Sequence, residues 1–180
     1  MTTATADTLR ELADKVELTE LVARIARAVD RRDRDGILAC YAERSFDDHG
    51  RFRGSGAEFA DFICDPEGFT AASPFIYHLM GQSLFDIDGD EAFGETYWTF
   101  WMQTQPDTLN QSIGRYADHF ERIDGVWQVV YRRVIIDWDG TVPVTNAVPG
   151  GHFRGSRDET DPSLRRLKWA EHPEHETSIG

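Results

Sequence analysis

Several features that mark common protein classes are missing from this 180-residue sequence. It contains two cysteines, Cys40 and Cys64, and neither lies in a CxxC pattern. A disulfide framework is therefore not expected, and both residues are predicted to be reduced, buried thiols. No apolar run approaches the ~20 residues of a transmembrane helix, and no secretory hydrophobic segment opens the chain. These absences lead us to expect a cytoplasmic protein.

Positive charge is also scarce. The chain carries 19 Lys and Arg residues against 32 Asp and Glu residues, which gives a net charge of -13. Phosphate-rich partners are bound by a basic face, so neither a nucleic acid nor a membrane surface is expected as a partner. The motifs HExxH, GxGxxG and GxSxG and the phosphate-binding P-loop are absent, and no spacing predicts a metal site. We therefore expect no metal and no cofactor.

What the sequence does contain suits one folded domain. Its hydrophobic content of 40% and aromatic content of 12% are enough for a sizeable core. Apolar spacing and capping patterns predict helices first, with one apolar stripe at Leu9, Leu12 and Val16 and a second over 18–29. Shorter helices are predicted at 36–41 and 55–63, and long strands at 74–87, 92–103 and 110–138. This order predicts an α+β fold for residues 1–140, followed by a C-terminal extension, 141–180, that docks on this domain or on a neighbouring subunit.

The segment 110–138 is predicted to form two long strands joined at Asp124-Gly125, a dipeptide typical of tight hairpins. Polar side chains alternate with aromatic and β-branched ones in both arms, which indicates that one face lines a polar pocket. Arg132 leaves two interpretations open. It points into the pocket, where it can stabilise an anion, or it makes a structural ion pair with an acid such as Asp118.

His78 and Asp30 are the strongest candidates for chemistry. His78 lies in an apolar strand, and an imidazole there stays basic if a carboxylate accepts its other N–H. Asp30 lies one turn after Ala26, at the edge of the buried stripe of the predicted helix, and is the natural partner. The alternatives are that Asp30 belongs to a solvated helix end and that His78 is a satisfied core residue. His49 either faces the same pocket or lies at its rim, and His119 is predicted to face outward.

Four segments resemble the SnoaL-like branch of the nuclear-transport-factor-two-like superfamily: RAVDRRDRDGI, FDDHGRFRG, IYHLMGQ and GRYADHFERIDGVWQVVYRRVIIDW. The order of the predicted elements resembles that branch as well, over residues 8–140. The resemblance implies a cone-shaped α+β barrel in which N-terminal helices pack on a curved, mostly antiparallel sheet. Because this fold carries both enzymes and binding modules, it does not by itself give an activity.

Within that branch the chain is most similar to scytalone dehydratase, hexachlorocyclohexane dehydrochlorinase and bile-acid dehydratase. In these cofactor-free enzymes a helix-end Asp pairs with a strand His that removes a proton, and these positions correspond to Asp30 and His78. The functional Arg on the last strand of the dehydrochlorinase corresponds to Arg132. Its apolar pocket positions correspond to Trp98 and Phe100.

The sequence also departs from these relatives. The second catalytic His of scytalone dehydratase corresponds to Ile113, and the Tyr that precedes its Asp corresponds to Val29. Some relatives carry Lys or Tyr at the position of Ile25. The general acid of those enzymes therefore has no counterpart here, and the residues that could replace it are Tyr41, His49, Tyr116 and Arg132.

The resemblance implies a cofactor-independent lyase, either a dehydratase or a related eliminating or isomerising enzyme. Its expected substrate is an apolar cyclic or aromatic hydroxylated molecule, and a homodimer or homotrimer is expected. His78 would abstract a proton, Asp30 would hold the imidazole, and Arg132 would stabilise the departing oxygen or an enolate. The expected substrate contacts are Tyr41, Phe46, His49, Met80, Trp98, Phe100 and Tyr116. Two other classes stay open, a non-catalytic small-molecule binding protein and a small scaffolding subunit of a ring-hydroxylating dioxygenase.

Overall fold

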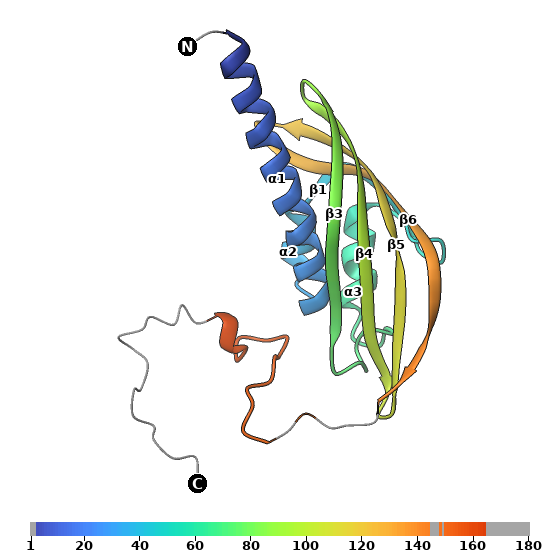
Figure 1. Cartoon of the computed structure of the whole chain (residues 1–180). Helices are drawn as coiled ribbons and strands as arrows, with labels where there is room; N and C mark the ends of the chain where they lie inside the picture. The colour runs from blue at the N-terminus through green and yellow to red at the C-terminus, as the bar shows by residue number, and fades with distance from the viewer. Residues whose placement is uncertain (1–2, 145–147, 149, 165–180) are drawn as a thin grey trace, which may run out of the picture.

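The computed structural model describes residues 3–144, 148 and 150–164, as helices laid against one face of a long curved sheet (Figure 1). The helices are α1 (Thr3–Arg31), α2 (Arg34–Leu38) and α3 (Gly56–Cys64). One sheet has the strand order β2-β1-β6-β5-β4-β3. Its strands are β1 (Tyr41–Asp48), β2 (Arg53–Gly54), β3 (Ile76–Asp88), β4 (Glu91–Gln105), β5 (Thr108–Ile123) and β6 (Val126–Pro143), and a 3-10 helix, η1 (Pro162–Leu164), follows in the extension. The predicted α+β class and the mostly antiparallel sheet are confirmed.

The sheet is antiparallel except where β1 runs parallel to β6. Its central hairpin turns at Asp124 and Gly125, whose φ angles are 51° and 82°. Both angles lie in the left-handed region that tight hairpin turns require and that Gly and Asp tolerate well. The hairpin predicted from the Asp-Gly dipeptide is confirmed, and it places β5 and β6 in register along most of their length.

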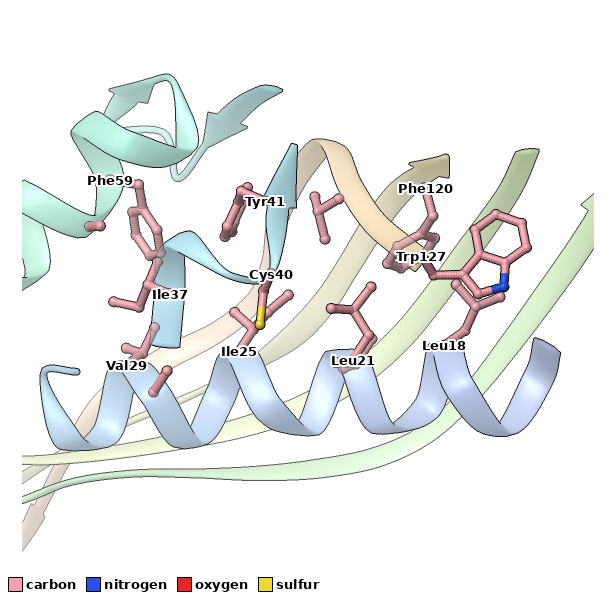
Figure 2. Close-up of a cluster of buried hydrophobic side chains, with 14 of the residues drawn as sticks. Leu18, Leu21, Ile25, Val29, Ile37, Cys40, Tyr41, Phe59, Phe120 and Trp127 are labelled. Atoms are coloured by element: carbon pink, nitrogen blue, oxygen red, sulfur yellow. The ribbon is translucent and has the colours of Figure 1, made fainter. Parts of the chain in front are cut away.

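The core lies between α1 and the concave face of the sheet. Leu18, Leu21, Ile25 and Val29 project from one side of α1 toward the short helices and the sheet (Figure 2). Their spacing of three or four residues places them on one helix face. Complete burial of each such side chain stabilises the fold by roughly 1.5–3 kcal/mol. The side chains that they meet include Ile37, Cys40, Tyr41, Phe59, Phe120 and Trp127.

The first predicted apolar stripe is not part of this core. Residues 3–31 form one continuous helix, and Leu9, Leu12 and Val16 on it are exposed. Asp14 lies between Leu12 and Val16 along the helix, and it is buried and accepts hydrogen bonds from Arg122 and Trp127 on the sheet, so the stripe lies on the side of α1 that points away from the sheet. Helical spacing groups these side chains on one face of the helix but does not show which face meets the sheet.

Local sequence signals fix the helix that closes one end of the core. Ser55 caps α3, and its side chain accepts from the backbone N–H of Glu58 while Glu58 bonds back to the backbone of Ser55. This is the predicted capping box. The helix ends at Cys64, just before Asp65-Pro66, since a proline disfavours helical backbone in the residue before it. Cys40 and Cys64 are both free thiols.

The C-terminal extension contacts the end of α1. Strand β6 continues to Pro143, past the boundary expected at residue 140. Beyond it, Asp161 pairs with Arg31 at 3.2 Å, and Arg157 donates to the backbone carbonyl of Thr70 at 3.0 Å. Histidines at 172 and 175 lie outside the described residues. Among the helices that the structure describes, none is long and apolar enough to cross a membrane.

Candidate active site

A cavity of about 190 Å³ lies between the helices and the concave face of the sheet. Helices α1 and α3 form one side of it, and strands β3 to β6 form the other. His49, His78 and Arg132 face it from three different strand regions. Its remaining lining is mostly apolar: Ile25, Ala26, Val29, Phe59, Ile63, Phe69, Thr70, Ile76, Trp98, Phe100, Ser112, Tyr116, Val134 and Ile136.

Asp30 and His78 meet at the edge of this cavity. Oδ1 of Asp30 lies 2.6 Å from Nδ1 of His78, and Oδ2 accepts from the backbone N–H of His78 at 3.0 Å. Both side chains are largely enclosed, with 18% of Asp30 and 10% of His78 exposed. An ionised carboxylate only accepts hydrogen bonds, so this contact assigns the proton of the neutral imidazole to Nδ1. The lone pair is then on Nε2, on the opposite side of the ring.

The end of α1 fixes the direction of the Asp30 carboxylate. Arg32 adopts a left-handed φ of 53° just after the last helical turn. The backbone N–H groups of Arg32 and Asp33 return to the carbonyls of Val29 and Ala28, at 3.0 and 2.9 Å. This closes the helix with the tight termination typical of a left-handed cap. The Arg32 side chain then binds the carbonyls of Ile63 and Asp65, at 3.2 and 2.6 Å, and ties the helix end to the end of α3.

A second Asp–His pair lies on the other side of the cavity. Asp47 is completely buried, accepts a hydrogen bond from the Tyr41 hydroxyl at 2.5 Å and contacts Nδ1 of His49. The His49 ring stacks on Phe59 with centroids 4.6 Å apart, and this holds the imidazole against the cavity wall. Burial, together with the nearby Asp47 carboxylate, raises the pKa of Tyr41 well above its ordinary value. The phenol therefore remains a donor to Asp47.

Arg132 makes a buried ion pair with Asp118, which is one of the two interpretations that the sequence left open. Its Nε and Nη2 donate to the two carboxylate oxygens of Asp118 at 2.8 and 2.7 Å. The guanidinium also lies 4.0 Å from the ring centroid of Tyr116. Burial lowers the pKa of Arg132, but Asp118 together with Tyr41 and Tyr116 outweighs this and raises the pKa of Arg132 well above its ordinary value. Arg132 therefore brings a fixed positive charge to the cavity wall while Asp118 compensates it from behind.

Aromatic side chains form the wall beside His78. Phe100 lies with its ring centroid 4.8 Å from that of His78, and Trp98 stacks on Tyr116 at 5.5 Å. Burial raises the pKa of Tyr116, so its phenol keeps its proton across the physiological range. The three residues face the cavity because Trp98 and Phe100 alternate correctly on β4, and Tyr116 faces the same way on β5.

Three other predicted contacts lie elsewhere. Phe46 is 40% exposed and stacks on Tyr131 outside the cavity, because its neighbour Asp47 takes the inward position on β1. Tyr41 is a buried core residue that supports Asp47 and does not line the cavity. Met80 lies in a larger groove at the cavity mouth, beyond His78.

Two further strand positions near the cavity differ from what the sequence predicts. Ile113 points outward, and the cavity-facing residue at this point of β5 is Ser112, which pairs with Phe100 across the strands. Ser112 also donates to Asp139 on β6. On β3, the inward alternation that starts at Ile76, His78 and Met80 is interrupted by a bulge between Met80 and Ser83. Alternation counted through that bulge gives the wrong face.

Asp47 is the functional candidate that sequence reasoning missed. Hydrophobicity predicted that Phe46 points into the cavity and that its charged neighbour Asp47 points to solvent, which is the reverse of what the structure shows. The signal that could have identified it was its spacing from His49, since residues two apart share a face. Among the described residues, Glu91, His119 and Glu121 are the cluster with spacing suited to a metal, and none of them lines the cavity. His119 stacks on Phe93, on the outward side as predicted.

The sequence from residue 10 to 133 matches the model of the SnoaL-like domain. The chain belongs to this family. The family has the nuclear-transport-factor-two-like fold, and the predicted resemblance is confirmed. No functionally curated protein matches the sequence.

Several solved structures share the fold of this SnoaL-like chain. A type 2 hexachlorocyclohexane dehydrochlorinase, LinA, superposes with a TM-score of 0.69 at 16% identity, covering 81% of this chain and 99% of that chain. A candidate scytalone dehydratase from Novosphingobium aromaticivorans gives 0.67 at 15% identity, covering 82% and 99%. Rv3472, a Mycobacterium tuberculosis protein of unknown function, gives 0.63 at 21% identity, covering 72% and 75%. Identities this low bear on the fold alone, and lyases are among these neighbours.

Proposed function

We propose that this protein is a cofactor-independent lyase, a dehydratase or a related eliminating or isomerising enzyme. The observation that carries the proposal is the hydrogen-bonded pair of Asp30 and His78 at the edge of a mostly apolar cavity. A base that must remove a carbon-bound proton needs a lone pair in a site with little competing water. The fold neighbours named as a dehydrochlorinase and as a candidate dehydratase support the same reaction class.

In the proposed reaction, Nε2 of His78 takes a proton from a carbon next to an activating group. Asp30 holds the imidazole through Nδ1 and stabilises the imidazolium that forms. A positioned general base typically contributes a factor of about 10²–10⁴ in rate. The electron pair of the broken C–H bond forms the new double bond, and the bond to the leaving group breaks.

The departing group meets the opposite wall. In its imidazolium form, His49 is held by Asp47 at Nδ1 and can give its Nε2 proton to a departing hydroxyl, which leaves as water. Arg132 and the protonated phenol of Tyr116 add a positive charge and an O–H donor where negative charge develops on oxygen. Two Asp–His pairs on opposite walls thus fill the roles of base and acid. His49 takes the role of the general acid, because this chain has no residue that corresponds to the general acid of the related enzymes.

The lining favours an apolar cyclic or aromatic substrate that carries a hydroxyl group. Trp98 and Phe100 line the cavity with aromatic rings, and Ile25 and Val29 from α1 close it. Aromatic rings stack well on such walls. At about 190 Å³ the cavity is smaller than the roughly 300–1,000 Å³ typical of whole ligand sites. The reacting ring is therefore the part that we place inside it.

A second candidate function is a scaffolding subunit of a ring-hydroxylating dioxygenase. It is favoured by large side chains exposed on the outer face of the sheet, namely Tyr77, Phe93, Tyr97 and Trp138. A fold neighbour described as a candidate aromatic ring hydroxylase points the same way, with a TM-score of 0.64 at 18% identity. In that case, as in a simple binding protein, Asp30 and His78 only satisfy each other. Co-purification with a large iron-bearing subunit would support the scaffold role.

The test of the lyase is a screen of cyclic hydroxy ketones and hydroxylated aromatic or steroid-like molecules in D2O, followed by mass spectrometry. We expect loss of water from a productive substrate. Recovered substrate should carry deuterium at the carbon from which His78 reversibly removes a proton. The activity is expected to survive exhaustive treatment with a chelator. Activity that disappears on chelation and returns with added metal would rule out the metal-free mechanism.

A further inference from the structure

A groove of about 1,320 Å³ continues outward from the cavity. It is formed by the end of α1, the start of β3 and the described part of the extension. Ala26, Ile76 and His78 line both hollows, so the groove meets the cavity at the proposed base. A substrate whose reacting ring is inside the cavity must have its remaining atoms in this groove.

The groove gathers positive charge on a protein whose net charge is -13. Four arginines line it: Arg27, Arg31, Arg154 and Arg157. Two acids line it as well, and both already have partners. Asp30 accepts from His78, and Asp161 accepts from Arg31 and Ser163. The acids therefore leave part of the arginine charge uncompensated.

Arg157 has an edge without a partner. Its Nη1 donates to the carbonyl of Thr70 at 3.0 Å, while Nε and Nη2 are buried and have no hydrogen-bond partner among the described residues. Burial, together with nearby Arg32, lowers the pKa of Arg157, but a guanidinium stays protonated in proteins. A buried charged donor without an acceptor is costly, so this edge is suited to an anionic ligand.

The two unpartnered nitrogens are the pair that binds a carboxylate in a bidentate manner. The same chain shows that arrangement at Arg132, whose Nε and Nη2 hold the two oxygens of Asp118 at 2.8 and 2.7 Å. We propose that Arg157 binds a carboxylate of the substrate in the groove while the apolar ring reaches His78 in the cavity. The inference rests on the proposed function for the role of His78. It narrows the substrate to cyclic or aromatic hydroxy acids and makes the extension part of the binding site.

The test is isothermal titration calorimetry with 2-naphthoate and its neutral isostere 2-naphthamide, at low salt, on the full-length protein. We expect the wild type to bind the carboxylate about tenfold more tightly than the amide, since a charge-assisted bidentate pair is lost with the amide. Arg157→Gln should bring the two affinities together by weakening 2-naphthoate alone. Arg157→Lys keeps the positive charge but loses the pair of parallel N–H donors. It should therefore retain part of the preference for 2-naphthoate over 2-naphthamide.

The control is Arg44→Gln, because the Arg44 side chain is 92% exposed and lies outside the groove. This variant should keep the full preference for 2-naphthoate. Equal affinity of the wild type for the two probes, or a preference that survives Arg157→Gln, would overturn the proposal. 2-Naphthyl phosphate serves as a third probe, and tighter binding of the phosphate than of the carboxylate would reject a carboxylate as the intended group. Because binding is measured without turnover, failure of the lyase assay does not affect this result.

Discussion

Replacing His78 with alanine is expected to lower turnover by a factor of about 10²–10⁴ while the fold stays intact. The variant loses the Nε2 lone pair that we assign as the base. It keeps the backbone N–H that donates to Asp30 at 3.0 Å, so the end of α1 remains tied to β3. Asp30 is partly exposed and can be hydrated on its other oxygen. The measurement is kcat on a substrate from the screen, alongside circular dichroism.

Asp30→Asn should have an effect of similar size for a different reason. Asp30 accepts from two donors, Nδ1–H and the backbone N–H of His78, whereas an asparagine side chain has one acceptor oxygen and one donor group. If the oxygen keeps the backbone N–H, the amide donor faces Nδ1 and forces the proton onto Nε2. The base is then blocked although the ring remains in place.

Asp35→Asn is the matched control for the dyad. It removes a carboxylate five residues further along the chain, from an exposed position in α2 that does not line the cavity. We expect its kcat to equal that of the wild type. Wild-type turnover in either His78→Ala or Asp30→Asn would show that the dyad is not catalytic.

Arg132→Met is expected to destabilise the protein by about 3–5 kcal/mol, because it leaves a buried carboxylate without its partner. The side chains of Arg132 and Asp118 are 3% and 1% exposed. A typical domain is stable by only about 5–15 kcal/mol, so this single change removes a large share of the total. Urea unfolding measures the loss. Arg133→Met, at the exposed neighbouring position, should change the stability by no more than about 0.5 kcal/mol.

The double variant Arg132→Met/Asp118→Leu separates an ion-pair effect from a packing effect. Replacing both partners by apolar groups should recover most of the stability that Arg132→Met loses. A double variant as unstable as the sum of both single variants would contradict the assignment of the loss to an unpaired charge.

The pH dependence of Arg132→Met has a definite sign. Burial raises the pKa of Asp118 even beside Arg132, and the substitution removes the charge that lowers it. The folded variant then binds a proton that the unfolded chain does not, so its stability falls as the pH rises through the folded pKa. The penalty relative to the wild type should be largest at neutral and alkaline pH and should shrink on acidification.

Local signals in the sequence predicted those parts of the fold that depend on neighbours along the chain. The Asp124-Gly125 turn and the Ser55–Glu58 capping box follow from backbone requirements within a few residues. The alternation that brought His78, Trp98 and Phe100 to one side of the sheet is equally local. The Asp30–His78 contact, across 48 residues, followed from the resemblance and from the apolar stripe of the helix.

The remainder depended on contacts and irregularities that the hydrophobic pattern does not contain. Asp47 is buried because Tyr41 and His49 satisfy it, so a charged residue occupies the inward position that hydrophobicity gave to Phe46. The bulge between Met80 and Ser83 shifts the alternation on β3. The extension has weak periodicity, and its position follows from ion pairs and hydrogen bonds with residues about 90 or more positions earlier, such as Arg157 with Thr70.

The central claim is that Asp30 holds His78 with its Nε2 lone pair directed to the cavity. The most direct measurement is nitrogen-15 NMR of histidine-labelled protein at pH 8, with the His78 signals assigned by their absence in His78→Gln. We predict a protonated Nδ1 and an unprotonated Nε2 for His78 in the wild type, and an inverted or mixed tautomer in Asp30→Asn. A wild-type His78 that carries its proton on Nε2 would contradict the proposed base.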